Sequence, residues 1–409
     1  MSSPRKHFVF ISSNRKWGGS EELWSATAAS LAAEGHRVTA YKAGLDRDEP
    51  RVRRLREAGA HLHDLARLPL PESVHSFLVR LSYAALHAQQ LVRLRMLLAL
   101  SRTPDLVVIS QGQNFDGVHI AGICRRMKLP YALVMQKAAD LYWPADQQLD
   151  GLRAIYSEAL ACYFVSEHNR RLTEEQLGME LPHASVVRNP FLVPWERRPD
   201  YLNDWPDESN GLRLACVGRI YPMEKGQDIL LRVLAREKWR NRPLSVSFLG
   251  EGLNRVAMEQ MARHLGLTSV TFGGFVADVA SIWATHHALV LPSRCEGLPL
   301  VLVEAMLSGR VPIVTDVAGN GEVVDDDVTG FLASAPTEDA LDEAMERAWI
   351  RRAEWRAIGE KAADAIRTLV PPDPAAAFAA TLKELCRQPN PRAASQPSPA
   401  PGRTPESAC

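Results

Sequence analysis

The most constraining feature of this sequence is the stretch from Ala288 to Ala318, in which two short apolar runs flank one helical pattern. The run from Ala288 to Leu291 predicts a buried parallel strand, and the run from Val311 to Thr315 predicts a second. Pro299 stands where the first turn of a helix favours proline. These elements form a βαβ unit. The loop after its first strand and the N-terminus of its helix offer unpaired N–H groups to an anion.

Two glutamates in this unit need an explanation, because a carboxylate beside an anion site is unfavourable unless it binds hydroxyl groups. Glu296 lies just ahead of the helix and Glu304 lies about two turns further on, so both can face one pocket. A carboxylate accepts hydrogen bonds well from paired sugar hydroxyls. The alternative is that Glu296 is a solvated loop acid and Glu304 caps a surface helix.

Length and charge restrict the class of protein. A chain of 409 residues suits two α/β domains of about 180 residues each. With 46% hydrophobic and 23% charged residues it has ample material for a globular core. Lysine plus arginine and aspartate plus glutamate balance at 48 each, so nothing indicates a nucleic-acid partner.

Cysteine usage and hydropathy indicate the compartment. The six cysteines are scattered without a Cys-x-x-Cys pair, which is typical of reduced thiols and not of a disulfide framework or a zinc site. The apolar run Phe8–Ile11 is too short for a signal peptide, and no segment reaches the ~18 apolar residues of a spanning helix. We therefore expect a cytoplasmic protein.

Alternating strands and helices fill the first half of the chain. A strand at Phe8–Ile11 is followed by Gly18-Gly19 and a helix, a phosphate-tolerant arrangement that is equally typical of a tight turn. Further buried strands are expected at 106–109, 131–135 and 162–165. Polar side chains follow two of them, where a doubly wound sheet binds its ligand. These are the acceptor-side candidates Gln111, Asn114, Gln136 and Lys137.

An arginine-rich region covers residues 46 to 102 and contains a long helical pattern from about Ser73 to Leu100. An amphipathic basic helix can lie on an anionic membrane surface, so peripheral contact with the cytoplasmic membrane face is one expectation. An ordinary solvated helix that covers the sheet is the favoured alternative.

Prolines after Asn189 interrupt the pattern, which restarts at Leu212. We expect an N-terminal domain over residues 1–195, a linker over 196–210 and a second domain over 211–372. A final helix over 373–388 and a disordered, Pro-, Ser- and Ala-rich tail over 389–409 complete the chain.

Glycine-bearing loops follow three strands of the second domain. Gly218-Arg219 and Lys225 come after the strand Leu212–Val217. Arginine can bind a diphosphate bidentately and lysine binds it as a point charge. Two further strands end in Gly250-Glu-Gly252 and Gly273-Gly274-Phe-Val276. Solvated loop charges would explain any one of these loops alone, but together with the paired glutamates they predict a nucleotide-type site.

In order and spacing, these motifs resemble the retaining glycosyltransferases of family 4. The resemblance rests on Val217-Gly-Arg219, Glu224-Lys225-Gly226, Gly250-Glu-Gly252, Glu296-x7-Glu304, Asn320-Gly-Glu322 and Thr329-Gly330-Phe331. It covers most of residues 8 to 386 and is strongest from 212 to 332. It implies the GT-B fold, an α/β fold in which two Rossmann-like doubly wound parallel-sheet domains face a central cleft.

The resemblance also implies roles for individual residues. Arg219 and Lys225 would bind the diphosphate of a nucleotide-sugar, and Glu296 would contact hydroxyls of the transferred sugar. Glu304 would hold the ribose. The other donor-binding positions would be Gly18, Gly19, Gly218, Gly250, Gly252, Gly274, Val276, Gly297, Leu298 and Leu300.

Such enzymes keep the anomeric configuration, usually by front-face attack in which the departing phosphate takes the acceptor's proton. They need no metal or cofactor, and we expect Asp325-Asp-Asp327 to be a surface turn. Two departures from the family pattern stand out. Many members have a histidine where this chain has Gln136-Lys137, and Met223 is an extra residue between Arg219 and Lys225.

The expected activity is transfer of a hexose from a UDP- or GDP-sugar to a glycan or lipid-linked acceptor in surface polysaccharide or glycoconjugate synthesis. A nucleotide-sugar epimerase or hydrolase of the same fold is one alternative, since fold does not fix the reaction. A non-catalytic partner subunit of a transferase is another. The intact Arg219, Lys225, Glu296 and Glu304 argue against the latter.

Overall fold

The computed structural model describes residues 4–14, 17–66, 91, 94–95, 98, 103–196 and 211–387. The tail after residue 388, most of the linker 196–210 and most of the helix expected at 73–100 lie outside these residues. Leu94 and Leu98, which belong to that helical pattern, are buried against the N-terminal sheet. Their burial is what a helix covering the sheet requires.

The N-terminal domain is built on one seven-stranded sheet whose strand pairs are all parallel. In spatial order the strands are β3 (His61–Asp64), β2 (Arg37–Lys42), β1 (His7–Ser12), β4 (Leu106–Gln111), β5 (Tyr131–Met135), β6 (Ala161–Phe164) and β7 (Ala184–Val186). Every residue of β1, β4 and β5 is buried, as expected for strands covered on both faces.

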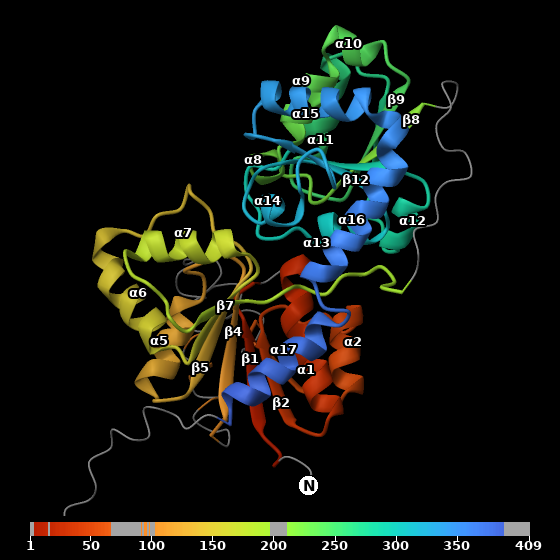
Figure 1. Cartoon of the computed structure of the whole chain (residues 1–409). Coiled ribbons are helices and arrows are strands. Elements are labelled where there is room, and N and C mark those ends of the chain that lie inside the picture. The colour runs from red at the N-terminus through yellow and green to blue at the C-terminus, as the bar shows by residue number, and fades with distance from the viewer. Residues whose placement is uncertain are drawn as a thin grey trace, which may run out of the picture.

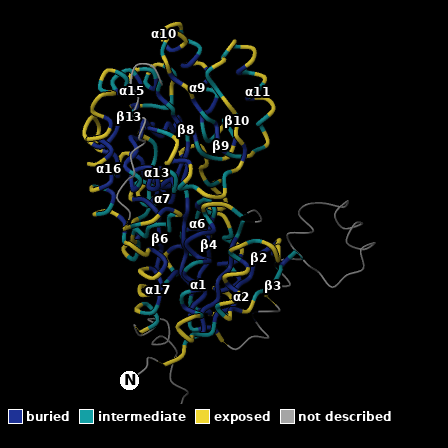
Figure 2. The backbone as a smooth tube through the Cα atoms, turned by 90° about the vertical axis from the view of Figure 1, so that its right-hand side faces the viewer, coloured by how far each residue is buried: buried dark blue, intermediate teal, exposed yellow. Residues whose placement is uncertain are grey.

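Helices cover both faces of this sheet. One apolar layer joins Phe8 and Phe10 to α1 (Glu22–Ala33) and α2 (Pro50–Glu57). The opposite layer joins Val9 and Ile11 to α5 (Val118–Arg126), α6 (Asp146–Glu158) and α7 (Glu167–Leu177). The short 3-10 turn η1 (Gly19–Glu21) precedes α1. Figure 2 shows the buried strands in the middle of each domain and the exposed residues on the outer helices and loops.

The C-terminal domain repeats the arrangement around a six-stranded parallel sheet. Its strands in spatial order are β10 (Val270–Gly274), β9 (Leu244–Leu249), β8 (Leu212–Val217), β11 (Ala288–Leu291), β12 (Val311–Thr315) and β13 (Phe331–Ala333). On one face lie α9 (Gln227–Leu234), α10 (Glu237–Arg240), α11 (Arg255–His264) and α15 (Glu338–Ile350). On the other lie α12 (Val279–Trp283), α13 (Leu300–Leu307), α14 (Asn320–Val323) and α16 (Trp355–Leu369), and the remaining short elements are α8 (Pro222–Lys225) and η2 (Arg352–Glu354).

The last helix, α17 (Pro374–Leu385), belongs in space to the first domain (Figure 1). Phe378, Ala379 and Leu382 are buried in the apolar layer that contains α1, and the ring of Phe378 meets Tyr163 edge-on at 5.0 Å. The chain therefore crosses back from the C-terminal domain to the N-terminal one.

Both sheets change direction once in strand order, between β1 and β4 and between β8 and β11. Open α/β sheets bind ligands outside the carboxyl ends of the strands at such a switch point. The prediction of two doubly wound parallel-sheet domains is confirmed. Within the described residues, no helix has the length and apolar character needed to span a bilayer.

Candidate active site

Four strand ends of the C-terminal domain are joined to one another at the carboxyl edge of its sheet. Ile220 N donates to the carbonyl of Glu251 at 3.0 Å, which ties the loop after β8 to the loop after β9. Gly250 N donates to the carbonyl of Gly274, the last residue of β10, at 2.7 Å. Arg294 N donates to the carbonyl of Glu224, which brings the loop after β11 to the same place. The motifs that lie far apart in the sequence therefore form one surface.

Gly226 has a backbone that only glycine can adopt comfortably at this position. Its φ is +65°, and a Cβ there would lie 1.8 Å from the carbonyl oxygen of Pro292. It ends α8 and begins α9, so it sets the position of Lys225 directly before it. The close approach to Pro292 is what seats the Lys225 loop on the loop that carries Glu296.

We expect Gly226→Ala to lower the free energy of unfolding by about 3 kcal/mol or more, because a left-handed L-residue costs roughly 1–2 kcal/mol and overpacking against Pro292 adds roughly 1–3 kcal/mol. Gly35→Ala is the matched control: its φ is +88° but nothing lies within 4 Å of the added carbon. Urea unfolding of both variants measures the difference. Equal losses would mean that the contact with Pro292 is unimportant.

Lys225 and Glu296 form a close ion pair in the middle of this surface. Lys225 Nζ lies 2.6 Å and 2.8 Å from the two carboxylate oxygens of Glu296. Ser293 Oγ donates to Oε1 of the same carboxylate at 2.7 Å, and Glu296 is only 5% exposed. Opposite charges and a hydroxyl thus hold a buried carboxylate in one orientation, next to the cation that the motif assigns to a diphosphate.

A second charged group links the two domains through Glu224. Lys137, which follows β5 of the N-terminal domain, places Nζ 2.8 Å from Glu224 Oε1. Arg219 Nη2 lies 2.8 Å from Glu224 Oε2. Burial raises the pKa of Glu224, but the hydrogen bond and charge of Lys137, with the charge of Arg219, outweigh it and hold the pKa below its usual value. Glu224 therefore stays ionised and binds Lys137 of the N-terminal domain and Arg219 of its own domain.

We expect Lys137→Met and Glu224→Gln each to lower turnover about tenfold, and the double variant to be no worse than the worse single one. Groups that act through one shared contact give non-additive effects. Steady-state kinetics on the three variants measures the coupling. Fully additive losses would mean that the pair does not act as a unit.

Glu304 is buried on α13 in an unfavourable environment for a charge. It is 3% exposed, and its Oε1 accepts a hydrogen bond from Leu192 N, in the segment that leads from the N-terminal domain, at 2.9 Å. Burial raises the pKa of Glu304 to about 7; the hydrogen bond from Leu192 opposes this and the charge of Glu22 adds to it. Hydrogen bonds donated by the hydroxyl groups of a ligand would stabilise the charged form of this buried carboxyl.

The Gly18-Gly19 loop of the N-terminal domain faces the start of α13. A Cβ on Gly19 would lie 2.9 Å from Cδ1 of Leu300, the first residue of that helix. The turn is held from behind by Glu21, which is fully buried and lies 3.0 Å from the equally buried Lys42 Nζ. Ser12 Oγ and Trp24 Nε1 also donate to the Glu21 carboxylate.

The remaining donor-side positions lie in the same region. Gly297 is where the domains touch, since a Cβ there would lie 2.0 Å from the carbonyl oxygen of Gln136. Leu298 is buried and Leu300 is half-buried. Gly218, Gly250 and Gly252 belong to the loops after β8 and β9, and Gly274 ends β10. Val276 packs under the apolar layer beside α13.

The acceptor-side candidates divide into two pairs. Gln136 and Lys137 lie at the domain interface, and Gln136 Nε2 is buried without a hydrogen-bond partner in the described structure. Gln111 and Asn114, by contrast, point into the N-terminal domain: Gln111 accepts from Tyr156 Oη, and Asn114 donates to Thr173 and Gln176. These hydrogen bonds support the loops, although Asn114 Oδ1 is buried without a hydrogen-bond partner in the described structure. The acceptor-side role of Gln111 and Asn114 stays a prediction.

The acidic triplet Asp325–Asp327 lies in a turn between α14 and β13. Arg347 Nη1 lies 2.9 Å from Asp326 Oδ1 and 2.7 Å from Asp327 Oδ1. Over the described ranges, no group of three or more His, Cys, Asp or Glu side chains has a metal-binding arrangement. Arg347 thus pairs with the carboxylates of both Asp326 and Asp327.

Sequence reasoning assigned no role to several charged residues of this region. Glu224 stood in the Glu-Lys-Gly motif, yet its pairing with Lys137 was not foreseen. Glu322 Oε1 accepts from His168 N of the other domain at 2.7 Å. Glu21 and Lys42 support the glycine turn. The signal that could have found Glu21 is an acid two residues after Gly18-Gly19, and no sequence signal marks the other pairings.

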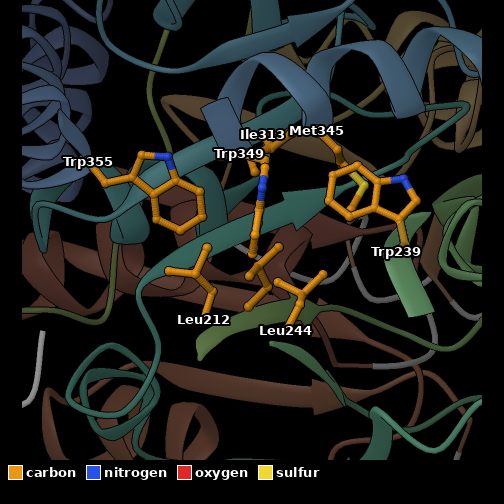
Figure 3. A pocket seen from close by; sticks show the side chains of 8 residues that line it. Leu212, Trp239, Leu244, Ile313, Met345, Trp349 and Trp355 are labelled. Atoms are coloured by element: carbon orange, nitrogen blue, oxygen red, sulfur yellow. The ribbon is translucent and has the colours of Figure 1, made fainter. Parts of the chain in front are cut away.

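A separate apolar pocket lies at the other end of the C-terminal domain (Figure 3). It is lined by Leu212, Leu214, Trp239, Leu244, Ile313, Met345, Trp349 and Trp355. Leu212 and Leu244 begin β8 and β9, so the pocket lies at the amino ends of the strands, away from the motifs. Its lining side chains pack as part of the core.

Three cations and two carboxylates of the candidate site are in contact with one another. Arg219, Lys225 and Lys137 face the carboxylates of Glu224 and Glu296. Three cations held by two carboxylates can bind a doubly charged anion without losing their fixed positions. The arrangement can therefore hold a diphosphate beside a hydroxyl-bearing group.

Comparison with known proteins agrees with this chemistry. Residues 211–350 match the family model described as Glycosyl transferases group 1. The chain is 25% identical to the glycogen synthase of Pseudomonas putida over 280 residues, which cover 60% of this chain and 53% of that protein. It is 29% identical to the GDP-mannose-dependent alpha-(1-6)-phosphatidylinositol monomannoside mannosyltransferase of Mycolicibacterium smegmatis over 219 residues, 47% of this chain and 54% of that enzyme. The chain thus spans about half the length of these curated relatives.

A solved structure is similar over almost the whole chain. HepE of Anabaena, in complex with UDP and glucose, superposes with a TM-score of 0.74 at 18% identity and covers 93% of this chain and 100% of its own. The GT-B fold is confirmed, and so is the resemblance to glycosyltransferases. The assignment to family 4 stays a prediction.

Proposed function

We propose that this chain, which has the GT-B fold and whose residues 211–350 match the group 1 glycosyl transferases, moves a hexose from a UDP- or GDP-sugar to a hydroxyl of a glycan or lipid-linked acceptor. The observation that carries the proposal is the cluster of Arg219, Lys225 and Glu296 at the carboxyl edge of the C-terminal sheet. The Gly18-Gly19 loop lies against α13, which follows Glu296.

The cations would act on the leaving group. Arg219 would bind the diphosphate as a planar fork and Lys225 as a point charge, and both would stabilise the negative charge that grows as the glycosidic bond breaks. Lys137 would add a third positive charge from the N-terminal domain. We propose on this ground that turnover needs no metal ion.

The carboxylates would position the sugars. Glu296, already oriented by Ser293 and Lys225, would accept hydrogen bonds from hydroxyls of the transferred hexose. Glu304 would accept from the ribose hydroxyls. Such positioning lowers the entropic barrier to attack by the acceptor hydroxyl, whose proton would pass to the departing phosphate. We propose that the anomeric configuration is retained.

Two similar proteins bear on the acceptor and the pathway. HepE was solved with UDP and glucose, and the mycobacterial relative is named for GDP-mannose and a phosphatidylinositol mannoside. We propose a role in surface polysaccharide or glycoconjugate synthesis on the cytoplasmic side of the membrane. An epimerase or hydrolase would differ in needing no acceptor.

Thermal unfolding with UDP, GDP, ADP and their sugar conjugates, with and without EDTA, tests donor binding. A ligand at 100 times its dissociation constant adds about 2.7 kcal/mol of stability, which is a clear shift in melting temperature. We expect an EDTA-insensitive shift with UDP or GDP compounds that is lost in Arg219→Ala. If none of these compounds shifts the melting temperature, the chain is not a nucleotide-sugar enzyme.

A further inference from the structure

The loop between β5 and α6 exposes three large apolar side chains in a row. Leu141, Tyr142 and Trp143 are 74%, 41% and 62% exposed. In Figure 1 this loop, coloured gold, rises beside α7 on the side of the N-terminal domain that faces the C-terminal domain. Consecutive exposed aromatic residues on a soluble domain mark a contact surface more often than chance, because water disfavours them.

A buried amide fixes this loop from below. Gln176 on α7 is almost completely buried, and its Nε2 donates to the carbonyls of Ala139 at 2.9 Å and Tyr142 at 3.2 Å. Its Oε1 accepts from Asn114. Trp143 Nε1 donates to the carbonyl of Asp140 at 3.0 Å, which sets the plane of the indole. The exposed rings therefore sit on a backbone held by buried hydrogen bonds.

The same loop begins at the candidate active site. Lys137 pairs with Glu224 of the other domain, and Asn114 N donates to the Lys137 carbonyl at 2.7 Å. Tyr142 is five residues further on. Five residues span at most about 18 Å, so its backbone lies within that distance of Lys137. The backbone that carries the rings is thus within a few sugar units of Lys137, on the side of the N-terminal domain that faces the donor-binding domain.

The charges around the rings restrict the partner. The sequence has no lysine or arginine between Lys137 and Arg153, whereas Asp140, Asp146 and Asp150 are exposed or half-exposed there. These carboxylates repel anionic lipid surfaces and nucleic acid. A neutral sugar ring suits the loop better, because its C–H face packs on an aromatic ring while carboxylates accept from the hydroxyls around its rim.

We propose that Tyr142 and Trp143 form an acceptor subsite that binds sugar units of a neutral glycan, beyond the unit that receives the hexose. This rests on the proposed glycosyltransferase function and names its acceptor class. The flat rings supply contact area at a small entropic cost, since each has few rotatable bonds and a fixed backbone. Asp140 and Asp146 flank them as hydrogen-bond acceptors.

The test compares the full chain with Tyr142→Ala/Trp143→Ala and, as a control, with Ile350→Ala, which removes a side chain that is 68% exposed on α15 of the other domain. The probes are neutral gluco-, manno- and galacto-oligosaccharides, offered on an array in the presence of UDP or GDP. We expect the wild type and Ile350→Ala to retain the same oligosaccharide and the double variant to lose at least tenfold in affinity. All three should bind nucleotide equally.

Three results would overturn the subsite. In the first, the wild type retains no oligosaccharide. In the second, the double variant retains the oligosaccharide as well as the wild type does. In the third, the double variant still binds the oligosaccharide but no longer binds phosphatidylcholine/phosphatidylglycerol vesicles that the wild type binds. Nucleotide binding is measured on the same samples by melting temperature. If the wild type binds no nucleotide, that result counts against the proposed function. The oligosaccharide result decides only whether Tyr142 and Trp143 form the acceptor subsite.

Discussion

Glu304→Gln is expected to stabilise the protein at pH 8 while weakening its binding of nucleotide. Burial raises the pKa of Glu304 from 4.5 to about 7. Between these values the folded state holds a proton that the unfolded state releases, so this carboxyl lowers stability as pH rises through the window. At pH 8 the whole penalty applies, and at about 1.4 kcal/mol per pKa unit it amounts to about 3 kcal/mol.

The amide removes this penalty because it does not ionise and can still accept from Leu192 N. Urea unfolding at pH 8 and pH 4.5 measures the gain, which should be large at pH 8 and nearly absent at pH 4.5. The same variant should bind UDP or GDP at least tenfold more weakly, because an amide is a poorer acceptor for two ribose hydroxyls. Glu175→Gln, an exposed glutamate on α7, is the control and should change neither quantity.

A Glu304→Gln variant with unchanged stability at pH 8 would show that the carboxyl is not strained by burial. A stabilised variant with full nucleotide affinity would show that the carboxyl is destabilised by burial but does not bind the nucleotide. The second result would remove Glu304 from the donor site.

Glu296→Gln is expected to lower turnover by roughly 100- to 1,000-fold, the range seen when one preorganised electrostatic group is removed from an active site. The amide has one accepting oxygen, so it can no longer receive both Lys225 and Ser293 and still bind a sugar hydroxyl. The fold and the affinity for UDP or GDP should stay within threefold of the wild type, because neither depends on a sugar hydroxyl.

The rate of nucleoside diphosphate release at saturating donor measures this effect, with melting temperature as a check on folding. Ser293→Ala is the matched variant: it removes only the hydroxyl that orients the carboxylate and should cost about tenfold. Near-normal turnover in Glu296→Gln would sink the role assigned to it.

The fold could be predicted because each buried strand has a recognisable pattern in its own short stretch of sequence. Runs such as Phe8–Ile11 and Ala288–Leu291 are apolar throughout and are followed by serine or proline, which is the pattern of parallel strands buried on both faces. Because each motif follows a strand, their loops could be predicted to lie at one edge of the sheet. The structure brings two of these loops together through the hydrogen bond from Arg294 N to the carbonyl of Glu224.

The supporting contacts could not be predicted, because they join residues far apart in the chain. Lys137 and Glu224 are 87 positions apart, and nothing in either segment signals the other. Gln111 and Asn114 show the same limit: a polar residue after a strand can face a ligand or the interior, and their contacts with Tyr156 and Gln176 have no signal in the sequence. Trp143 was overlooked because an exposed tryptophan has no periodic signature.

The central proposal is that Arg219, Lys225 and Glu296 act on a nucleotide-sugar, and release of nucleoside diphosphate tests it most directly. The purified chain is incubated in EDTA with UDP-glucose, UDP-galactose, UDP-N-acetylglucosamine and GDP-mannose, together with the neutral oligosaccharides, beside Arg219→Ala and Glu296→Gln. We expect one sugar nucleotide to be consumed only when an oligosaccharide is present, with an anomeric configuration in the product equal to that of the donor and with little release by either variant. Release at equal rates in the wild type and both variants, or no consumption of any donor by folded protein, would contradict it.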